Sequence, residues 1–496
     1  MHSLSDMPVE LLDIILCRLY YTPEGLRGPV KDFKALHQVL LLNKRFFSIA
    51  VKHLYQDITP MSSDLVKAKQ LYSTLLCAAK NKTSVPYCEY AEEFALDKRC
   101  ERHDLEIILR AILQHGQLRG LAVEFPQYLP LIATLPNFDG TTLKRLKVAF
   151  FGKVVRKDPQ SLSRIKALTS QMHLESLEVD MYCPHPLDWD FPSHTLLHVS
   201  LQELSMVYYN PPETWEPQLT QKNGIILSSY TKRILASQYQ TLTSLSLSGV
   251  TLDLTPGISL SKLQKLRLRM CRVTGWENLC MSLAALTSLE LLDVYFSDNP
   301  DFAHPELLEE LRVARSWCPD SNGLACLLED HSKSFRSLRV LDFTGFMSTN
   351  TMATILSKNP HLAEFEYRYS AEEFGSDDDS LFSDIDEPPP PDDDYLEVIS
   401  QLAPAKLKRL TITFGNYSSE GLSSFIASFP ASIDSLNLDD SAGLTTGHLH
   451  ALLQMPLDRL SLDDIKVEDK HWDEMEKMAS DAEKIRDTWK FTYSIA

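Results

Sequence analysis

The sequence predicts an α/β repeat fold, in which a solenoid with a parallel concave sheet and outer helices follows a small three-helix module. A Leu-x-x-Leu-x-apolar hexad recurs from residue 118 to the C-terminal region, helical patterns lie between its copies, and residues 1–60 follow a different apolar spacing. One strand–turn–helix unit cannot bury its own apolar face, so the copies are expected to stack.

Composition limits the classes of partner. The chain has 496 residues, with 49 Lys and Arg against 67 Asp and Glu, so its formal charge is −18. This charge argues against nucleic acid and membrane surfaces as partners. The first residues lack a basic signal region and no apolar run approaches the roughly 18 residues that span a bilayer, so we expect a soluble protein of the cytoplasm or nucleus. The nine cysteines show no metal-binding spacing and are expected to be reduced, with no cofactor or metal.

Residues 1–60 predict three short helices with an apolar surface larger than they can bury. The first helix begins at Pro8, and Leu11, Ile14, Ile15 and Leu19 share one of its faces. A loop over 21–31 precedes a second helical pattern, and Asn43 can cap a third helix over 44–55. Because so small a module leaves apolar area uncovered, it is expected to bind a partner.

This module resembles an F-box, the helical motif that binds the Skp-type adaptor of Skp–cullin–F-box ubiquitin ligases. The resemblance rests on Met-Pro-Val-Glu-Leu-Leu-Asp-Ile-Ile at 7–15, Leu-Leu-Asn-Lys-Arg-Phe-Phe at 41–47 and Leu-Tyr at 54–55. Met7 stands where the family has leucine, and the loop over 21–31 is longer than the family's. The resemblance implies adaptor contacts, or the core behind them, at Pro8, Leu11, Ile14, Ile15, Leu19, Leu40, Phe46, Leu54 and Tyr55. The alternative is that residues 1–60 only cap the solenoid.

Twelve hexads carry the repeat prediction. Seven of the eleven spacings between successive copies lie between 21 and 27 residues, which is typical of one strand and one helix per repeat. Weaker copies begin at Ala91 and at Leu308, and the second of these also fits a helix. The twelve copies begin at Leu118, Leu143, Leu174, Leu201, Leu242, Leu263, Leu289, Leu338, Leu362, Leu407, Ile433 and Leu457.

These copies resemble the leucine-rich repeat family, in which Asn or Cys commonly follows the strand. Cys271 holds that place in one repeat, whereas others have residues such as Ser441, so the repeats are degenerate. Together the two modules resemble F-box/leucine-rich repeat proteins. The resemblance implies a substrate-recognition subunit that docks a Skp-type adaptor, and through it a cullin, while its concave face binds a protein substrate.

Side chains alternate along a strand, so the third, fifth and seventh positions of each hexad are predicted to face solvent on the concave side. This places Lys265, Arg267 and Arg269 on one basic strand, Arg145 and Lys147 on another, and Tyr295 in or beside the surface. One hypothesis is that the first of these strands binds an acidic or phosphorylated substrate segment. A solvated charged strand, or an intramolecular contact with the acidic insertion, are the alternatives.

Two further segments complete the predicted organisation. Residues 372–394 hold 11 acidic residues, four prolines and no Lys or Arg, so an insertion over 371–395 is predicted to be disordered. It is either a regulated segment with kinase sites at Ser376 and Ser383 or a plain tether. A one-sided apolar helix over 468–496 is predicted to cap the solenoid. The predicted domains are then 1–60, a helical linker over 61–90, the repeats over 91–467, and this cap.

An enzyme is the least supported class, because the sequence has no phosphate-binding loop, zinc-protease motif or nucleophile elbow. We expect no small-molecule substrate. A repeat scaffold for protein interaction, unrelated to ubiquitin, remains the alternative function.

Overall fold

The computed structural model divides into two units, residues 1–223 and 224–496. It describes residues 11–12, 21–22, 30–31, 44–58, 65–96, 100–115, 117–123, 128, 142–151, 173–182, 200–208, 235, 240–253, 260–277, 283–297, 304–316, 325–369, 390–467, 477 and 490–495.

Unit 1 contains consecutive parallel strands, each paired with the next one along the chain. Phe94 lies opposite Leu121, and Leu121 lies opposite Leu146, so the fourth hexad positions are in register. The weak copy at Ala91 therefore forms a true repeat, and one more strand precedes it. The strands are β3 (Asp57–Ile58), β4 (Glu93–Leu96), β5 (Gly120–Val123), β6 (Arg145–Phe151), β7 (Ser176–Tyr182) and β8 (Glu203–Tyr208).

The helices of unit 1 are α3 (Lys44–Gln56), α4 (Leu65–Ala79), the 3-10 helix η2 (Tyr87–Tyr90) and α5 (Arg102–Gln114). Helix α3 runs directly into β3, so the predicted boundary at residue 60 falls after the first strand of the repeats. The Tyr72 hydroxyl on α4 donates a hydrogen bond to the Ala95 carbonyl on β4 at 3.0 Å. The predicted linker therefore contains the helix that packs on the first repeat. Part of the predicted loop over 21–31 is an antiparallel pair, β1 (Tyr21–Thr22) with β2 (Val30–Lys31).

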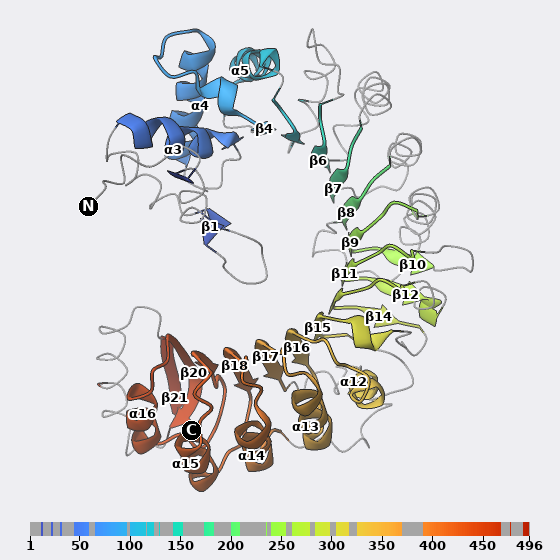
Figure 1. The fold of residues 1–496 in the computed structure, drawn as a ribbon, viewed down its shortest axis with the longest axis vertical. Coiled ribbons are helices and arrows are strands. Elements are labelled where there is room, and N and C mark those ends of the chain that lie inside the picture. The colour runs from blue at the N-terminus through green and yellow to red at the C-terminus, as the bar shows by residue number, and fades with distance from the viewer. Residues whose placement is uncertain are drawn as a thin grey trace. The chain divides into compact units, whose positions relative to one another are not determined.

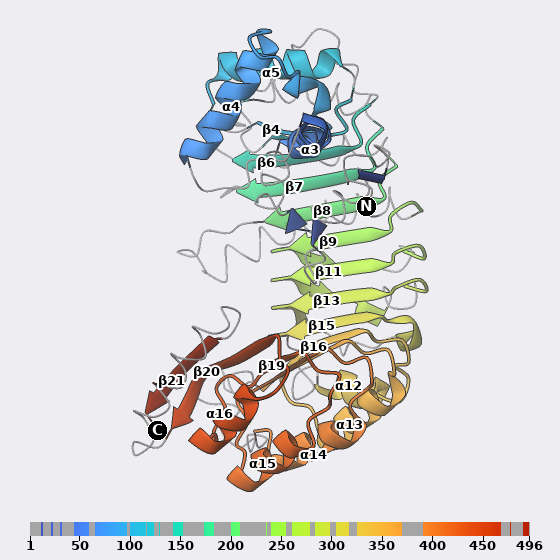
Figure 2. The same cartoon turned by 60° about the vertical axis from the view of Figure 1, so that its left-hand side comes forward.

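Unit 2 repeats the same arrangement, and its strands β9 to β15 are stacked in order in Figure 2. Leu245, Leu266 and Leu289 lie opposite one another and are buried. Burying such a leucine contributes about 1.5–3 kcal/mol, which is why the hexad pattern fixes the register. The strands are β9 (Ser244–Ser248), β11 (Lys265–Arg269), β13 (Ser288–Leu292), β15 (Glu310–Ala314), β16 (Val340–Thr344), β17 (Glu364–Arg368), β18 (Arg409–Thr413), β19 (Ser435–Asn437), β20 (Arg459–Val467) and β21 (Lys490–Ile495).

The register corrects the predicted hexad at Leu289. Leu289 pairs with Leu266, the fourth position of its own hexad, so the copy begins at Leu286. The leucines at 286, 289, 291 and 292 satisfy either start, and only strand pairing separates the two. The copy at Leu308 is also a strand, β15, rather than a helix. Starts at Leu242, Leu263, Leu286 and Leu308 are then 21, 23 and 22 residues apart.

Helices cover one side of the unit 2 strands. Figure 1 shows α13 to α16 together on one side of β16 to β20. The small parallel sheet β10 (Thr251–Asp253), β12 (Arg272–Thr274) and β14 (Tyr295–Phe296) lies on the outer side of β9, β11 and β13. The helices are η7 (Pro305–Leu307), α12 (Ala325–His331), α13 (Thr349–Lys358), α14 (Asp393–Leu402), α15 (Ser419–Ala427) and α16 (Thr446–Leu453).

A left-handed residue follows the strand at the eighth position of seven repeats in unit 2. Its N–H bonds to a carbonyl of the next repeat in most of them, for example Met270 N–H to the Leu292 carbonyl at 2.8 Å. The turn therefore links neighbouring repeats. The seven residues are Gly249, Met270, Asp293, Arg315, Gly345, Phe414 and Asp440.

The ninth position links repeats through side chains. The Cys271 thiol donates to the Leu247 carbonyl of the preceding repeat at 3.4 Å. In the equivalent place the Ser316 hydroxyl accepts a hydrogen bond from Val294 N–H at 3.2 Å. Burial raises the pKa of the Cys271 thiol to about 11, so it is a hydrogen-bonded thiol and not a nucleophile.

Two predictions about the less regular segments were wrong at their ends. Residues 390–395 of the predicted disordered insertion are ordered, because Asp392 caps α14 and Asp393 and Asp394 occupy its first turn. Residues 490–495 form strand β21 beside β20 and not a capping helix. The remainder of the acidic insertion, 371–389, lies outside the described residues, as does 468–489 apart from Lys477, which is helical.

Candidate protein-binding face

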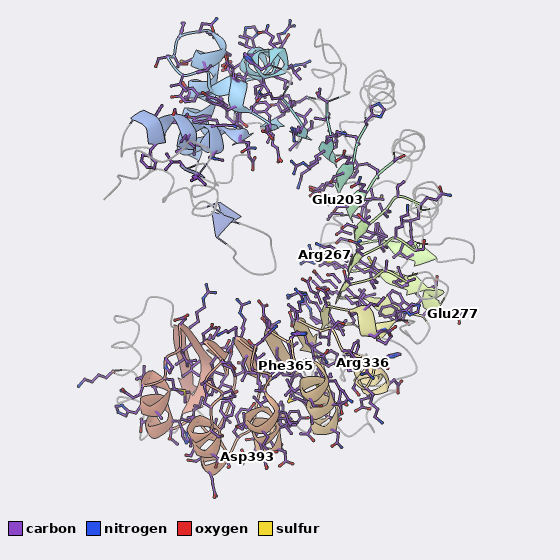
Figure 3. All side chains as sticks on the ribbon, in the orientation of Figure 1. Glu203, Arg267, Glu277, Arg336, Phe365 and Asp393 are labelled. Atoms are coloured by element: carbon purple, nitrogen blue, oxygen red, sulfur yellow. The ribbon has the colours of Figure 1, made fainter. Side chains whose placement is uncertain are left out.

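The third, fifth and seventh hexad positions of β9 to β20 form what we call the open face of unit 2. In β11 the side chains alternate between exposed Lys265, Arg267 and Arg269 and buried Leu266 and Leu268. Figure 3 shows Arg267 on the side of the strand layer opposite to Glu277. The predicted alternation is therefore confirmed in this strand. It is wrong in β18, where Thr411 and Thr413, at the fifth and seventh positions, are buried.

Strand β11 brings its three cations next to a strand of serines. Lys265 lies opposite Ser244, Arg267 opposite Ser246, and Arg269 opposite Ser248 on β9. Side chains in such register pairs lie about 5 Å apart at their Cβ atoms. Ser244 and Ser246 are half-buried, whereas Ser248 is buried. The hydroxyl donors of Ser244 and Ser246 therefore share one small area with the cations, which suits a carboxylate or a phosphate group.

Only the central cation of β11 is neutralised. Arg267 lies opposite Glu290 on β13, and its Nη2 is 2.6 Å from Glu290 Oε2. Lys265 and Arg269 form no ion pair with any residue in the described part of the chain. Two uncompensated positive charges are thus separated by one compensated charge along the strand.

The rest of the fifth-position row forms a ladder of alternating charge. Arg267, Glu290, Arg312, Asp342 and Glu366 lie on five neighbouring strands, each opposite the next. Arg312 Nη1 is 3.4 Å from Asp342 Oδ2. Because successive charges have opposite sign as far as Asp342, this part of the open face compensates itself.

Two arginines from the neighbouring rows complete the ladder. Arg368 Nη2 lies 2.6 Å from Glu366 Oε2 and its Nη1 lies 3.5 Å from Asp342 Oδ1. Arg409 Nη1 lies 3.1 Å from Glu364 Oε2. Burial raises the pKa of Asp342, and Arg368 opposes this rise without cancelling it.

Unit 1 places Arg145 and Lys147 on the equivalent positions of β6, and both already have partners. The Arg145 guanidinium reaches over Gly120 on β5 to pair with Glu93 on β4. Lys147 Nζ lies 2.6 Å from Glu178 Oε1 and 3.5 Å from Asp180 Oδ2. Burial alone would lower the pKa of Lys147, but Glu178 and Asp180 outweigh it and raise the pKa. These two cations are less available to a partner than those of β11.

Tyr295 does not belong to the open face. The predicted start at Leu289 would place it at the seventh hexad position, whereas the start at Leu286 places it beyond the strand, on β14 of the small sheet. There the Arg272 guanidinium lies 5.0 Å from the centroid of its ring. The same error in the hexad start concealed Glu290, and the uncounted copy at Leu308 concealed Arg312. Equal spacing of the starts was the available signal for both.

The described residues of the N-terminal module divide between surface and core. Leu11 is helical and 47% exposed. Phe46 is buried, Leu54 is half-buried, and the Tyr55 ring lies 4.4 Å from that of Tyr87 on η2. Burial raises the pKa of Tyr55 to about 12. The other predicted adaptor contacts lie outside the described residues: Pro8, Ile14, Ile15, Leu19 and Leu40.

The described residues show neither a metal site nor a membrane-spanning helix. Over the described ranges, no three or more His, Cys, Asp or Glu side chains are arranged to hold a metal ion. Each helix in these ranges is too short or too polar to span a bilayer.

No family model and no curated protein matches the chain. Among solved structures, an internalin (inlF) from Listeria monocytogenes aligns with 85% of this chain and 95% of its own, at 14% identity and a TM-score of 0.33. So low a TM-score carries no functional argument, and the repeat fold rests on the strand pairing described above.

Proposed function

We propose that this protein is the substrate-recognition subunit of a Skp–cullin–F-box type ubiquitin ligase and that the open face of unit 2 binds its protein substrate. The observation that carries the binding half is the pairing of β9 with β11. A strand with two uncompensated cations beside a strand of hydroxyl groups suits an acidic or phosphorylated segment. Such a receptor performs no chemistry, because it only holds the target lysine near the charged conjugating enzyme.

The ligase half is supported by the F-box pattern of residues 4–58 and by exposed Leu11 at one of its predicted contact positions. A non-ubiquitin protein-interaction scaffold is the second candidate. The continuity of α3 with β3 and the contact of Tyr55 with Tyr87 favour it, since both are also expected of an N-terminal cap.

The binding half is tested by titrating the full chain with a fluorescent peptide of Glu and phosphoserine, read by anisotropy. Lys265→Ser combined with Arg269→Ser should weaken binding at least about tenfold, because two uncompensated charges are removed. Arg267→Ser should weaken it less, because Glu290 already compensates Arg267.

The matched control combines Lys333→Ser with Lys358→Ser, which removes two exposed lysines that lie outside the open face. It should leave the affinity unchanged. Equal losses in the control and in the β11 variant would mean that the peptide responds only to net charge, and the open face would lose its assignment.

A further inference from the structure

We propose a second protein-contact surface in unit 2, the turn patch, made by Met270, Arg272, Tyr295 and Arg315. It binds an acidic protein segment that carries an apolar side chain. This surface lies beyond the carboxyl ends of β11 to β15 and does not depend on the ligase role.

The first observation is backbone strain at an exposed apolar residue. Met270 has a φ of 50°, and 48% of its surface is exposed. A left-handed conformation is unfavourable for a residue with a Cβ, and Gly249 and Gly345 avoid that cost at the same position of other repeats. The backbone conformation is explained by the Met270 N–H bond to the Leu292 carbonyl, which glycine would keep as well. The methionine side chain, however, gains little burial, and an exposed apolar side chain at a position that glycine can fill is a reason to look for a binding role.

The second observation is a pair of arginines near Met270 in the chain and in the stack of repeats. The Arg272 guanidinium lies over the Tyr295 ring, 5.0 Å from its centroid, and the two residues are register neighbours on β12 and β14. Arg315 has the eighth position two repeats beyond Met270, and its Nε lies 2.8 Å from Asp293 Oδ1 while 67% of its side chain stays exposed. Three arginine or methionine side chains and a tyrosine give the composition of an interface core.

The charge of the turn patch indicates which kind of partner segment binds it. The turn patch and its neighbour Asp293 contain two arginines against one carboxylate, so the local charge is positive in a chain whose net charge is −18. Guanidinium groups bind carboxylates in a bidentate manner, and Met270 supplies an adaptable apolar contact. A nucleic acid is disfavoured because the many acidic residues of the chain would repel its phosphates.

The test uses the full chain with Lys265→Ser and Arg269→Ser as its background, so that the open face does not bind the acidic probe. Two short fluorescent peptides are read by anisotropy: one consists of Glu, Ser and Gly with a single Leu, and the other has Ser in place of Leu. The background protein should bind the Leu peptide about fivefold more tightly than the Ser peptide. Met270→Gly should abolish this preference without lowering the thermal midpoint, and Arg272→Gln should weaken both peptides about fivefold.

Phe414→Gly is the matched control, because Phe414 is also left-handed, at the eighth position and 47% exposed. It should retain the preference for Leu. Met270→Asn removes the apolar side chain but tolerates the left-handed backbone, and it should behave as Met270→Gly does. The proposal is overturned if both Met270 variants retain the preference, or if Phe414→Gly loses it equally. Tighter binding of a single-stranded oligonucleotide, lost in Arg272→Gln, would reassign the patch to nucleic acid.

Discussion

At the scale of single residues, the eighth position of each repeat is where backbone conformation limits the sequence. Seven repeats of unit 2 have a positive φ there, yet only two of them place glycine at it. Met270, Asp293 and Phe414 carry the cost of a left-handed Cβ and keep an N–H bond to the next repeat. Gly345, with a φ of 139°, lies where other residues are rarely found.

Gly345→Ala should therefore reduce the free energy of unfolding by about 1–3 kcal/mol, because the backbone must strain or move. Gly447→Ala should instead increase the free energy of unfolding. An added Cβ at Gly447, in the first turn of α16, has no neighbour nearer than 3.6 Å and favours the helix by about 0.5 kcal/mol. Urea denaturation of both variants measures the difference. Equal losses would show that φ at position 345 is not what limits the residue.

Asp342 gives the charge ladder a pH dependence. Burial raises its pKa in the folded protein above the ordinary value of 3.8, so the folded state holds the proton to a higher pH than the unfolded state does. Stability from this group is therefore present below pH 3.8 and is lost as the pH rises through the raised pKa. As the pH rises from 3.8 through the raised pKa, the thermal midpoint of the wild type should therefore fall relative to that of Asp342→Asn. A difference that is constant between about pH 4 and pH 7, or that changes in the other direction, would contradict this.

At the scale of elements, a carboxylate connects two successive helices. Asp393, in the first turn of α14, accepts hydrogen bonds from Ser418 N–H at 2.9 Å and from the Ser418 hydroxyl at 2.5 Å. Ser418 is the N-cap of α15, and Figure 3 shows Asp393 in the region of the two helices. A Cβ at Gly421 would lie 2.1 Å from Asp393 Oδ1, so this contact requires glycine.

A double-mutant cycle tests this contact. Gly421→Ala alone should cost about 1–2 kcal/mol, because Asp393 must leave Ser418. In the Asp393→Ala background the same change should be neutral or gain up to about 0.5 kcal/mol, as for any helical glycine. Additive effects would show that Asp393 and Gly421 are not coupled. Urea denaturation of the four proteins is sufficient.

Elements could be predicted from the sequence where leucine spacing alone determines them. Eleven of the twelve proposed hexads and the weak copy at Ala91 lie in register in the strand pairing of their units, together with Leu308. The hexad at Leu289 failed because four nearby leucines fit two starts. The prediction of disorder failed at the end of the acidic insertion because helix capping at Asp392 outweighs charge repulsion. Composition alone does not show this capping.

The candidate site was less predictable than the fold for a physical reason. Periodicity places Lys265, Arg267 and Arg269 on one face, but their availability depends on what stands opposite in the next repeat. Glu290 compensates Arg267, and nothing within the described residues pairs with Lys265 or Arg269. That distinction requires the register between β11 and β13, which a hexad start wrong by three residues conceals.

At the scale of the whole molecule, the proposed function requires a docking module and a protein-binding face in one chain. Stacked repeats contact only their neighbours, so a change on β11 should leave the N-terminal module folded and functional. The two activities can therefore be lost separately. A variant of Lys265 and Arg269 should keep its adaptor, and a variant of Leu11 should keep the phosphopeptide.

The most direct measurement of the central claim is co-purification of the full chain with a purified Skp-type adaptor. The wild type should retain the adaptor, and Leu11→Asp should lose it, because Leu11 is an exposed apolar residue on the predicted contact surface. Leu307→Asp, at a leucine of unit 2 that is 42% exposed, should retain it. Circular dichroism should show all three proteins equally folded. Failure of the folded wild-type protein to retain the adaptor would contradict the ligase role and leave the interaction scaffold as the function.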